Sequence, residues 1–101
     1  MKKKLPPIHP GEILHAEFMV PQDISSNALA RALGVTPARI SEIVRGQRGI
    51  SADTALRLAR CFGTTPQFWL NLQQAYELQC AEDAAGREIA RVRPWAASRA
   101  A

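Results

Sequence analysis

Polar and cationic side chains recur in residues 36–48 at a spacing that suits binding to nucleic acid. On a helical wheel of residues 37–45, at about 100° per residue, Ile40 and Ile43 fall on one side. Arginine can make forked hydrogen bonds to guanine or phosphate, serine can bind base or backbone, and an alanine methyl suits thymine. The outer side is therefore predicted to meet base edges and phosphates in a DNA major groove. It carries Ala38, Ser41, Glu42 and Arg45, with Thr36 and Arg39 at its rim.

Glu42 has two interpretations on this face. Its carboxylate can accept a hydrogen bond from a cytosine amino group, or it can hold Arg39 or Arg45 in place. The second interpretation is favoured.

Further polar residues flank this helix and are predicted to contact the DNA backbone. Ser26 and Asn27 lie at the start of the preceding helix, where backbone amide hydrogens attract an anion. Gln47 and Arg48 lie in the loop just past this helix. Phosphate contacts of this kind set the register on the duplex but carry no sequence information.

The segment from Ser25 to Gly46 contains two short helices around a glycine, the pattern of a helix-turn-helix. Ala30 is small enough to let the two helices cross closely, and Gly34 can adopt the left-handed conformation that ends the first of them. The outer face of the second helix is then free to enter a groove.

Cap residues, prolines and glycines predict five helices and no strand. Residues 1–9 are expected to form an extended arm, 10–80 the helix-turn-helix domain, and 81–101 a partly mobile C-terminal extension. Asp53 is placed in the first turn of the fourth helix, where negative charge is favoured. The expected boundaries are Pro10 to Pro21, Ser25 to Gly34, Thr36 to Gly46, Ser51 to Gly63, and Thr65 to about Cys80. Residues expected to face the core are Ile13, Leu14, Phe18, Leu29, Ala30, Leu33, Ala55, Leu58, Ala59 and Phe62.

The fifth helix is too apolar for a helix with one buried face. Phe68 and Leu72 are assigned to the core. Trp69 and Tyr76 are predicted to form a dimer seam, because helix-turn-helix proteins commonly use two copies to span two half-sites.

The formal net charge of +4 arises entirely from the helix-turn-helix and its flank. Residues 25–60 hold six arginines against Glu42 and Asp53, whereas the segments on either side are each neutral. A basic excess confined to such a motif indicates a phosphate-binding surface. The sequence also lacks an apolar run long enough to cross a bilayer and a secretory signal, so a cytoplasmic location is expected.

An enzyme is the weakest of the possible classes. No serine or cysteine has a convincing base partner, no glycine-rich phosphate loop is present, and no cofactor is expected. Cys61 and Cys80 are expected to be free thiols, and His9 and His15 are too far apart to share a helix face, so no metal site is predicted. His15 is interpreted as a surface histidine.

Three stretches resemble the HigA-type (VapI-like) antitoxins of the XRE helix-turn-helix family. They are IHPGEIL at 8–14, GVTPARISEIVRGQRGISADTALRLAR at 34–60 and FGTTPQFWLNLQ at 62–73, and the similarity covers about residues 8–78. The resemblance implies a five-helix, lambda-repressor-like all-α domain that acts as a homodimer in the bacterial cytoplasm. It also implies binding to double-stranded operator DNA at its own promoter. The recognition-helix positions of the family then correspond to Thr36, Ala38, Arg39, Ser41 and Arg45.

The resemblance further implies a protein partner, a HigB-type toxin of the RelE-like fold that cleaves mRNA on the ribosome. Family members often have Asn where Ser41 stands and Gly near Asp23; the first difference is expected to alter operator preference and the second to matter little. The toxin-binding surface is expected in the first helix with the arm, or in the segment after Leu78.

Two alternatives to an antitoxin remain. A stand-alone XRE-family repressor would use the same DNA surface without a toxin, and the reading frame beside it would distinguish the two. A protein-interaction module that no longer binds DNA is disfavoured by the confined positive charge.

Overall fold

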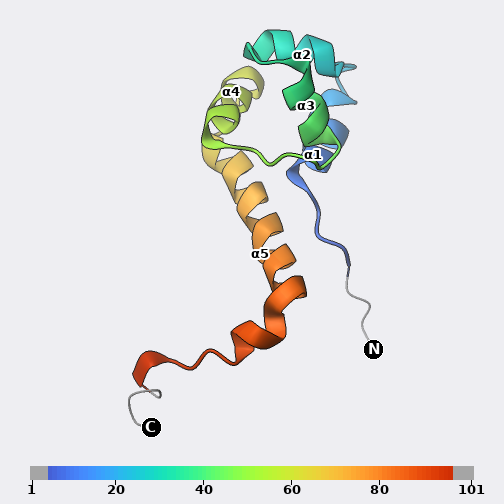
Figure 1. The fold of residues 1–101 in the computed structure, drawn as a ribbon. Helices are drawn as coiled ribbons and strands as arrows, with labels where there is room; N and C mark the ends of the chain where they lie inside the picture. Colours follow the sequence, from blue (N-terminus) through green and yellow to red (C-terminus); the bar gives the residue numbers. More distant parts are fainter. Residues whose placement is uncertain (1–4, 97–101) are drawn as a thin grey trace.

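The structure, a computed structural model, describes residues 5–96 and is all-α in that range. The all-α prediction is confirmed, and the helices follow one another in the expected order (Figure 1). They are α1 (Pro10–Ile13), continued by the π-helical segment η1 (Leu14–Met19), then α2 (Ser26–Leu33), α3 (Pro37–Val44), α4 (Ala52–Phe62) and α5 (Pro66–Ala90).

The first helix changes geometry part-way along its length. After α1 the chain widens into η1, in which the N–H of Val20 donates to the carbonyl of His15, five residues earlier, at 2.9 Å. Asp23, in the link that follows, has a φ of 53°. An aspartate tolerates this left-handed conformation, which glycine adopts without steric cost. The backbone at this position therefore favours glycine or an aspartate.

Every later helix starts with the cap that the sequence predicts. The hydroxyls of Ser25, Thr36, Ser51 and Thr65 each accept a hydrogen bond from the backbone N–H three residues on, at 3.1–3.3 Å. Each hydroxyl thereby satisfies one of the unpaired donors of a helix N-terminus.

The core lies between η1, α2, α3, α4 and the first half of α5. The indole of Trp69 is fully buried at its centre, and the rings of Phe18, Phe62 and Phe68 surround it. The indole Nε1 donates to Thr64 Oγ1 at 2.8 Å, so the polar edge of the ring is also satisfied. Most of the predicted core is confirmed. Phe18 and Phe62 are half-buried at its border, whereas Ile13 is half-buried but does not pack against it.

The assignment of Trp69 to a dimer seam is therefore wrong. Its side chain has no exposed surface in the protomer, whereas Phe68, which was assigned to the core, is 36% exposed. Both rings lie on the first turn of α5. Which of them faces Phe18 and Phe62 depends on how the helix is rotated about its own axis. Helical periodicity alone cannot set that rotation.

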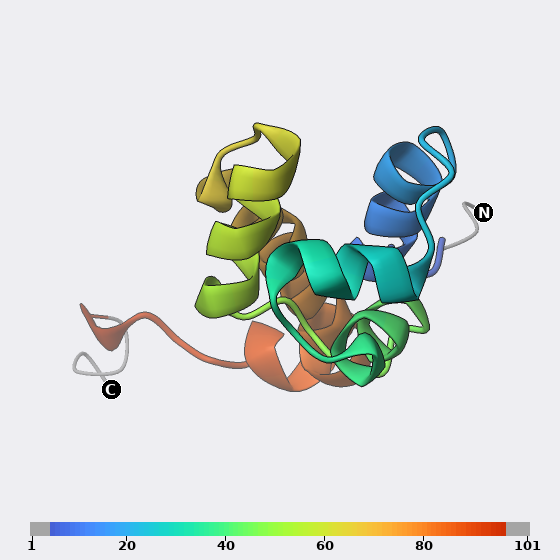
Figure 2. The same ribbon diagram turned by 90° about the horizontal axis from the view of Figure 1, so that it is seen from above.

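Helix α5 is longer than expected. It continues past Cys80 to Ala90, with a bend at Ala85, whose φ of −134° is not helical. Residues 81–90 contain no proline, and alanine, glutamate and arginine favour a helix. Figures 1 and 2 show α5 passing under the other helices and then extending away from them, so its C-terminal part lies outside the body that they form. The mobility expected for the end of the chain concerns residues 97–101, which lie outside the described residues.

Candidate nucleic-acid interface

Helices α2 and α3 meet through a tight turn at Gly34. This glycine has φ 72° and ψ 35°, the left-handed conformation that ends α2, and the N–H of Val35 then donates to the carbonyl of Ala30 at 3.0 Å. Ala30 is fully buried, which allows α2 and α3 to pack closely. The turn therefore has the geometry of a helix-turn-helix, with α3 as the second helix.

The two faces of α3 differ as the helical wheel predicts. Ile40 and Ile43 have no exposed surface. On the opposite side the predicted contact residues reach solvent to different degrees: Thr36, Ala38 and Arg45 are exposed, whereas Arg39, Ser41 and Glu42 are half-buried. The polar edge of α3 is thus open to a large ligand.

Arg39 is held by an acid from another helix. Its Nη1 donates to Asp53 Oδ2 of α4 at 3.0 Å. The same carboxylate oxygen accepts from Arg57 Nε at 2.9 Å, one helical turn further along α4. The hydrogen bonds from Arg57 and Arg39 hold the pKa of Asp53 below its usual value, so this carboxylate is charged at neutral pH.

Arg57 extends this network to the turn before α3. Its Nη1 donates to the carbonyl oxygen of Leu33 at 2.8 Å and lies 3.4 Å from that of Gly34. These carbonyls belong to the end of α2, where no intrahelical donor remains. One exposed arginine thus connects α4, the turn and, through Asp53, the recognition helix.

Glu42 does not hold Arg39 or Arg45, so that interpretation is wrong. Its Oε1 instead accepts from Arg48 Nη2 at 2.8 Å, from the loop after α3. Gly46 has a φ of 75°, and the chain turns there after α3, which brings Arg48 close to Glu42. Arg45 makes no ion pair with any described residue and keeps its full cationic charge exposed.

The loop after α3 is tied to α5 by Gln73. Its side-chain oxygen accepts from the backbone N–H of Ile50 at 2.8 Å, while its amide donates to Glu77 at 2.8 Å. Gly49 lies against the same amide, close enough that an added Cβ would touch it. This anchor fixes the loop that carries Gln47 and Arg48, which are both exposed. Asn27 is exposed at the start of α2 and Ser26 is half-buried there.

The chain is similar to known helix-turn-helix proteins. A family model described as helix-turn-helix matches residues 16–69, more than half of the chain. Virulence-associated protein I of Dichelobacter nodosus is 60% identical over 81 residues, which cover 80% of this chain and 75% of that protein. Antitoxin HigA-1 of Vibrio cholerae is 43% identical over 77 residues, covering 76% of this chain and 72% of the relative. The chain belongs to the HigA-type antitoxins of the helix-turn-helix family.

A solved structure agrees with this membership. Antitoxin HigA of Pseudomonas aeruginosa, determined with the higBA promoter, superimposes with a TM-score of 0.85 at 54% sequence identity. The match covers 88% of this chain and 98% of that protein. The described fold is therefore that of a HigA-type antitoxin.

In this HigA-type chain, the HPGE stretch at 9–12 locks the first helix against the recognition helix. His9 Nδ1 accepts from the N–H of Gly11 at 2.9 Å, and Glu12 Oε2 accepts from the N–H of His9 at 3.1 Å, which forms a capping box. A Cβ on Gly11 would overlap the carbonyl oxygen of Ile43, in the last turn of α3. Only glycine allows this close approach, so the motif sets how deeply α1 packs against α3.

His9 also contacts α5. Its ring is buried and meets Tyr76 edge-on, with 4.8 Å between ring centroids, and it faces Gly46 on its other side. Residues 5–8 form neither helix nor strand, and residues 1–4 lie outside the described residues, so the extended arm over residues 1–9 stays a prediction. His9 at the end of the arm was not expected to belong to the core, and the HPGE pattern was the signal that could have placed it there.

The burial of His9 predicts a pH dependence of stability. Burial lowers the pKa of His9 below 6.5, and the charge of Glu12 opposes this only in part; Tyr76 faces the ring from α5. The unfolded chain therefore binds the proton at a higher pH than the folded chain does. The contribution of His9 to stability is complete above pH 6.5 and is lost as the pH falls through the lowered pKa.

Urea unfolding between pH 8 and pH 5 measures this dependence. We expect the free energy of unfolding to decline below about pH 6.5, and the decline to be smaller in His9→Asn, because asparagine caps a helix without titrating. Equal pH profiles for the two proteins would show that His9 does not titrate differently on folding.

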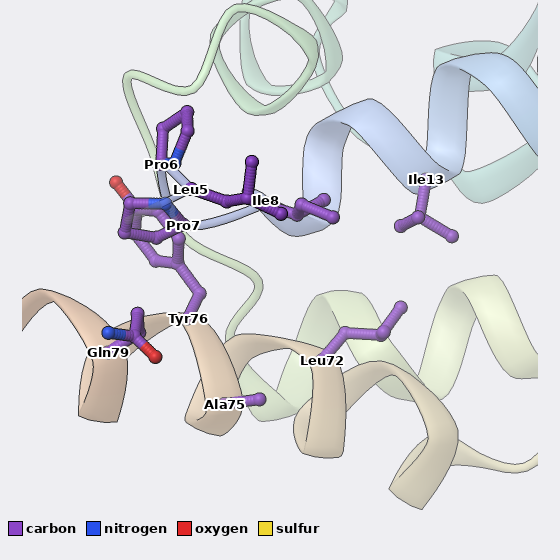
Figure 3. Close-up of a pocket in the computed structure, with 9 residues that line it drawn as sticks. All are labelled: Leu5, Pro6, Pro7, Ile8, Ile13, Leu72, Ala75, Tyr76 and Gln79. Atoms are coloured by element: carbon purple, nitrogen blue, oxygen red, sulfur yellow. The ribbon is translucent and has the colours of Figure 1, made fainter. Parts of the chain in front are cut away.

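An apolar groove of about 550 Å³ lies between the arm and α5. Figure 3 shows Leu5 to Ile8 on one side of it and Leu72, Ala75 and Tyr76 on the other. Tyr76 is half-buried, and a side-chain hydrogen bond with Cys80 raises the pKa of its phenol.

The thiols of Cys80 and Cys61 are free. In residues 5–96 no helix is long and apolar enough to cross a membrane, and no group of three acidic, histidine or cysteine side chains is placed to hold a metal.

Proposed function

We propose that this chain is an antitoxin that represses its own promoter by binding operator DNA and that also neutralises a HigB/RelE-like mRNA endonuclease. The observation that carries the DNA-binding part is the placement of α3. Its inner face is packed through Ile40 and Ile43, and its outer face exposes Arg45, which has no ion pair within residues 5–96. The likeness to the Pseudomonas aeruginosa antitoxin HigA, determined with the higBA promoter, supports it.

Contacts within the complex divide into two classes. Residues on α3 enter the major groove and meet base edges or adjacent phosphates, whereas residues at the start of α2 and in the loop after α3 bind the backbone and set the register. The first class comprises Thr36, Ala38, Arg39, Ser41 and Arg45, and the second comprises Ser26, Asn27, Gln47 and Arg48.

Two copies acting together would span two half-sites about 34 Å apart. The dimer surface is assigned to Tyr76 and to the large apolar residues that follow it. Leu78, Ile89, Val92 and Trp95 are 65%, 51%, 75% and 76% exposed, on a segment that leaves the body of the protein. A second copy that covers them would remove this apolar area from water. Sedimentation is expected to give twice the protomer mass of 11.1 kDa.

The partner toxin is proposed to be encoded beside this chain, and both proteins to act in the bacterial cytoplasm. Co-expression with the neighbouring reading frame and affinity purification tests this part. Recovery of DNA-binding protein without any bound partner would favour a stand-alone repressor.

Removal of either arginine on α3 is expected to weaken operator binding by about 1–3 kcal/mol while leaving the fold intact. Arg39→Ala and Arg45→Ala are compared with the parent by gel shift on the DNA upstream of the gene, over a range of salt concentrations. Each lost phosphate contact lowers the slope of log affinity against log salt by about 0.9.

Arg60→Ala is the matched control, because it removes the same charge from an exposed position in the last turn of α4, outside the residues assigned to DNA or to the dimer. Operator affinity unchanged in both α3 variants, or reduced equally in the control, would place the wrong surface against DNA.

A further inference from the structure

We propose that Asp53 is a positioning residue that orients Arg39 for the operator and so raises the preference for operator over other DNA. The proposal rests on the DNA binding proposed above. From its sequence position Asp53 only provides negative charge in the first turn of α4. Its contacts indicate a second role.

The carboxylate of Asp53 lies between two arginines with different anchors. Arg57 is fixed at its far end by the backbone carbonyl of Leu33, at 2.8 Å, so it holds the carboxylate in place from the side of the turn. Arg39 is bound to the other side of the same oxygen, at 3.0 Å. The side chain of Arg39 is 30% exposed and uses one of its five N–H groups in this ion pair. The remaining N–H groups are left for a base or a phosphate.

An arginine that is held in one orientation before DNA arrives gives up less side-chain entropy on binding. This advantage applies to a contact at a fixed place on a base edge. It does not apply to loose contacts with phosphates, which a mobile arginine can make in many orientations. Fixing Arg39 therefore favours the cognate sequence selectively.

The negative charge of Asp53 also lowers the affinity of this surface for all duplexes alike. The carboxylate is 57% exposed and borders a depression of about 490 Å³ that is also lined by Arg39, Arg48 and Arg57. A carboxylate at this surface offsets part of the attraction between the arginines and any duplex, irrespective of sequence. Its loss would strengthen binding to operator and unrelated DNA by the same factor, so a change in the ratio of the two affinities reports on the orientation of Arg39.

Asp53→Asn tests the proposal through a ratio of affinities. Dissociation constants are measured for the operator duplex and for a scrambled duplex of the same length and composition. We expect the ratio of the two to fall by about tenfold in Asp53→Asn, with weaker binding to the operator and no loss of binding to the scrambled duplex. Thermal unfolding of the variant is expected to match that of the parent closely, because exposed ion pairs contribute little to folding.

Two further variants test whether the change in the ratio is specific to the contact between Asp53 and Arg39. Glu82→Gln removes the same charge from an exposed position on α5 and is expected to leave the ratio unchanged. In an Arg39→Ala background, Asp53→Asn is expected to change the ratio by less than about twofold, because the side chain that it positions is absent.

An unchanged ratio in Asp53→Asn, or an equal fall with and without Arg39, would overturn the proposal. Failure of the parent chain to bind its operator would instead overturn the proposed function.

Discussion

Replacing Trp69 by alanine is expected to lower the free energy of unfolding by about 3–5 kcal/mol. The indole has no exposed surface, packs against Phe18 at 4.9 Å and Phe68 at 5.0 Å between ring centroids, and donates a hydrogen bond to Thr64. Its removal would leave a large cavity and an unpaired hydroxyl. A small domain is stable by about 5–15 kcal/mol, so this one change removes a large part of the total. Urea unfolding monitored by circular dichroism measures the loss.

Trp95→Ala is the control for this prediction, since Trp95 is the other tryptophan of the chain and is 76% exposed. At protein concentrations at which only the protomer is present, the control is expected to unfold at the same urea concentration as the parent. At higher concentrations it is expected to weaken association, while Trp69 continues to report on the core by fluorescence. A similar loss of protomer stability in the two variants would contradict the arrangement of the core.

The second large effect is expected at Gly11. Gly11→Ala would place a methyl group on the carbonyl oxygen of Ile43, and backbone cannot move aside as a flexible side chain can. We expect the free energy of unfolding to fall by about 3 kcal/mol, at the upper end for overpacking. Operator binding is then expected to weaken as well, because Ile43 lies in the last turn of α3.

Gly86→Ala offers the matched comparison. Gly86 lies in α5, and among the described residues only its own stretch of helix backbone and its chain neighbours come within 4 Å of the position that a Cβ would occupy. Alanine is expected to be neutral there or to stabilise the helix by up to about 1 kcal/mol. If Gly11→Ala were as stable as Gly86→Ala, the close approach of α1 to α3 would not be a constraint on this fold.

Features that depend on neighbours in the chain could be predicted from the sequence. The caps at Ser25, Thr36, Ser51 and Thr65 and the left-handed end of α2 at Gly34 involve groups within a few residues of each other. The buried side of α3 followed from the three-residue spacing of its isoleucines. These features are encoded locally, and the structure has them as expected.

Features that depend on how helices pack could not be predicted in the same way. The choice of Trp69 over Phe68 for the core, and the pairing of Asp53 with Arg39, fourteen residues away, depend on the relative placement of separate helices. The pairing of Glu42 with Arg48 depends on how the chain turns after α3. A helical wheel represents one element at a time and contains none of this information.

The placement of the first helix has a consequence for the order of folding. The pairs α2–α3 and α4–α5 are each adjacent along the chain, so they can form early with little loss of loop entropy. Helix α1 instead contacts α3 and α5, which come much later, and its short turn depends on the His9 cap for its start. We expect its docking to be the last step on the way to the native state and the first to be reversed. Among the buried amides, hydrogen exchange would then be fastest in α1, the helix that packs against the end of α3.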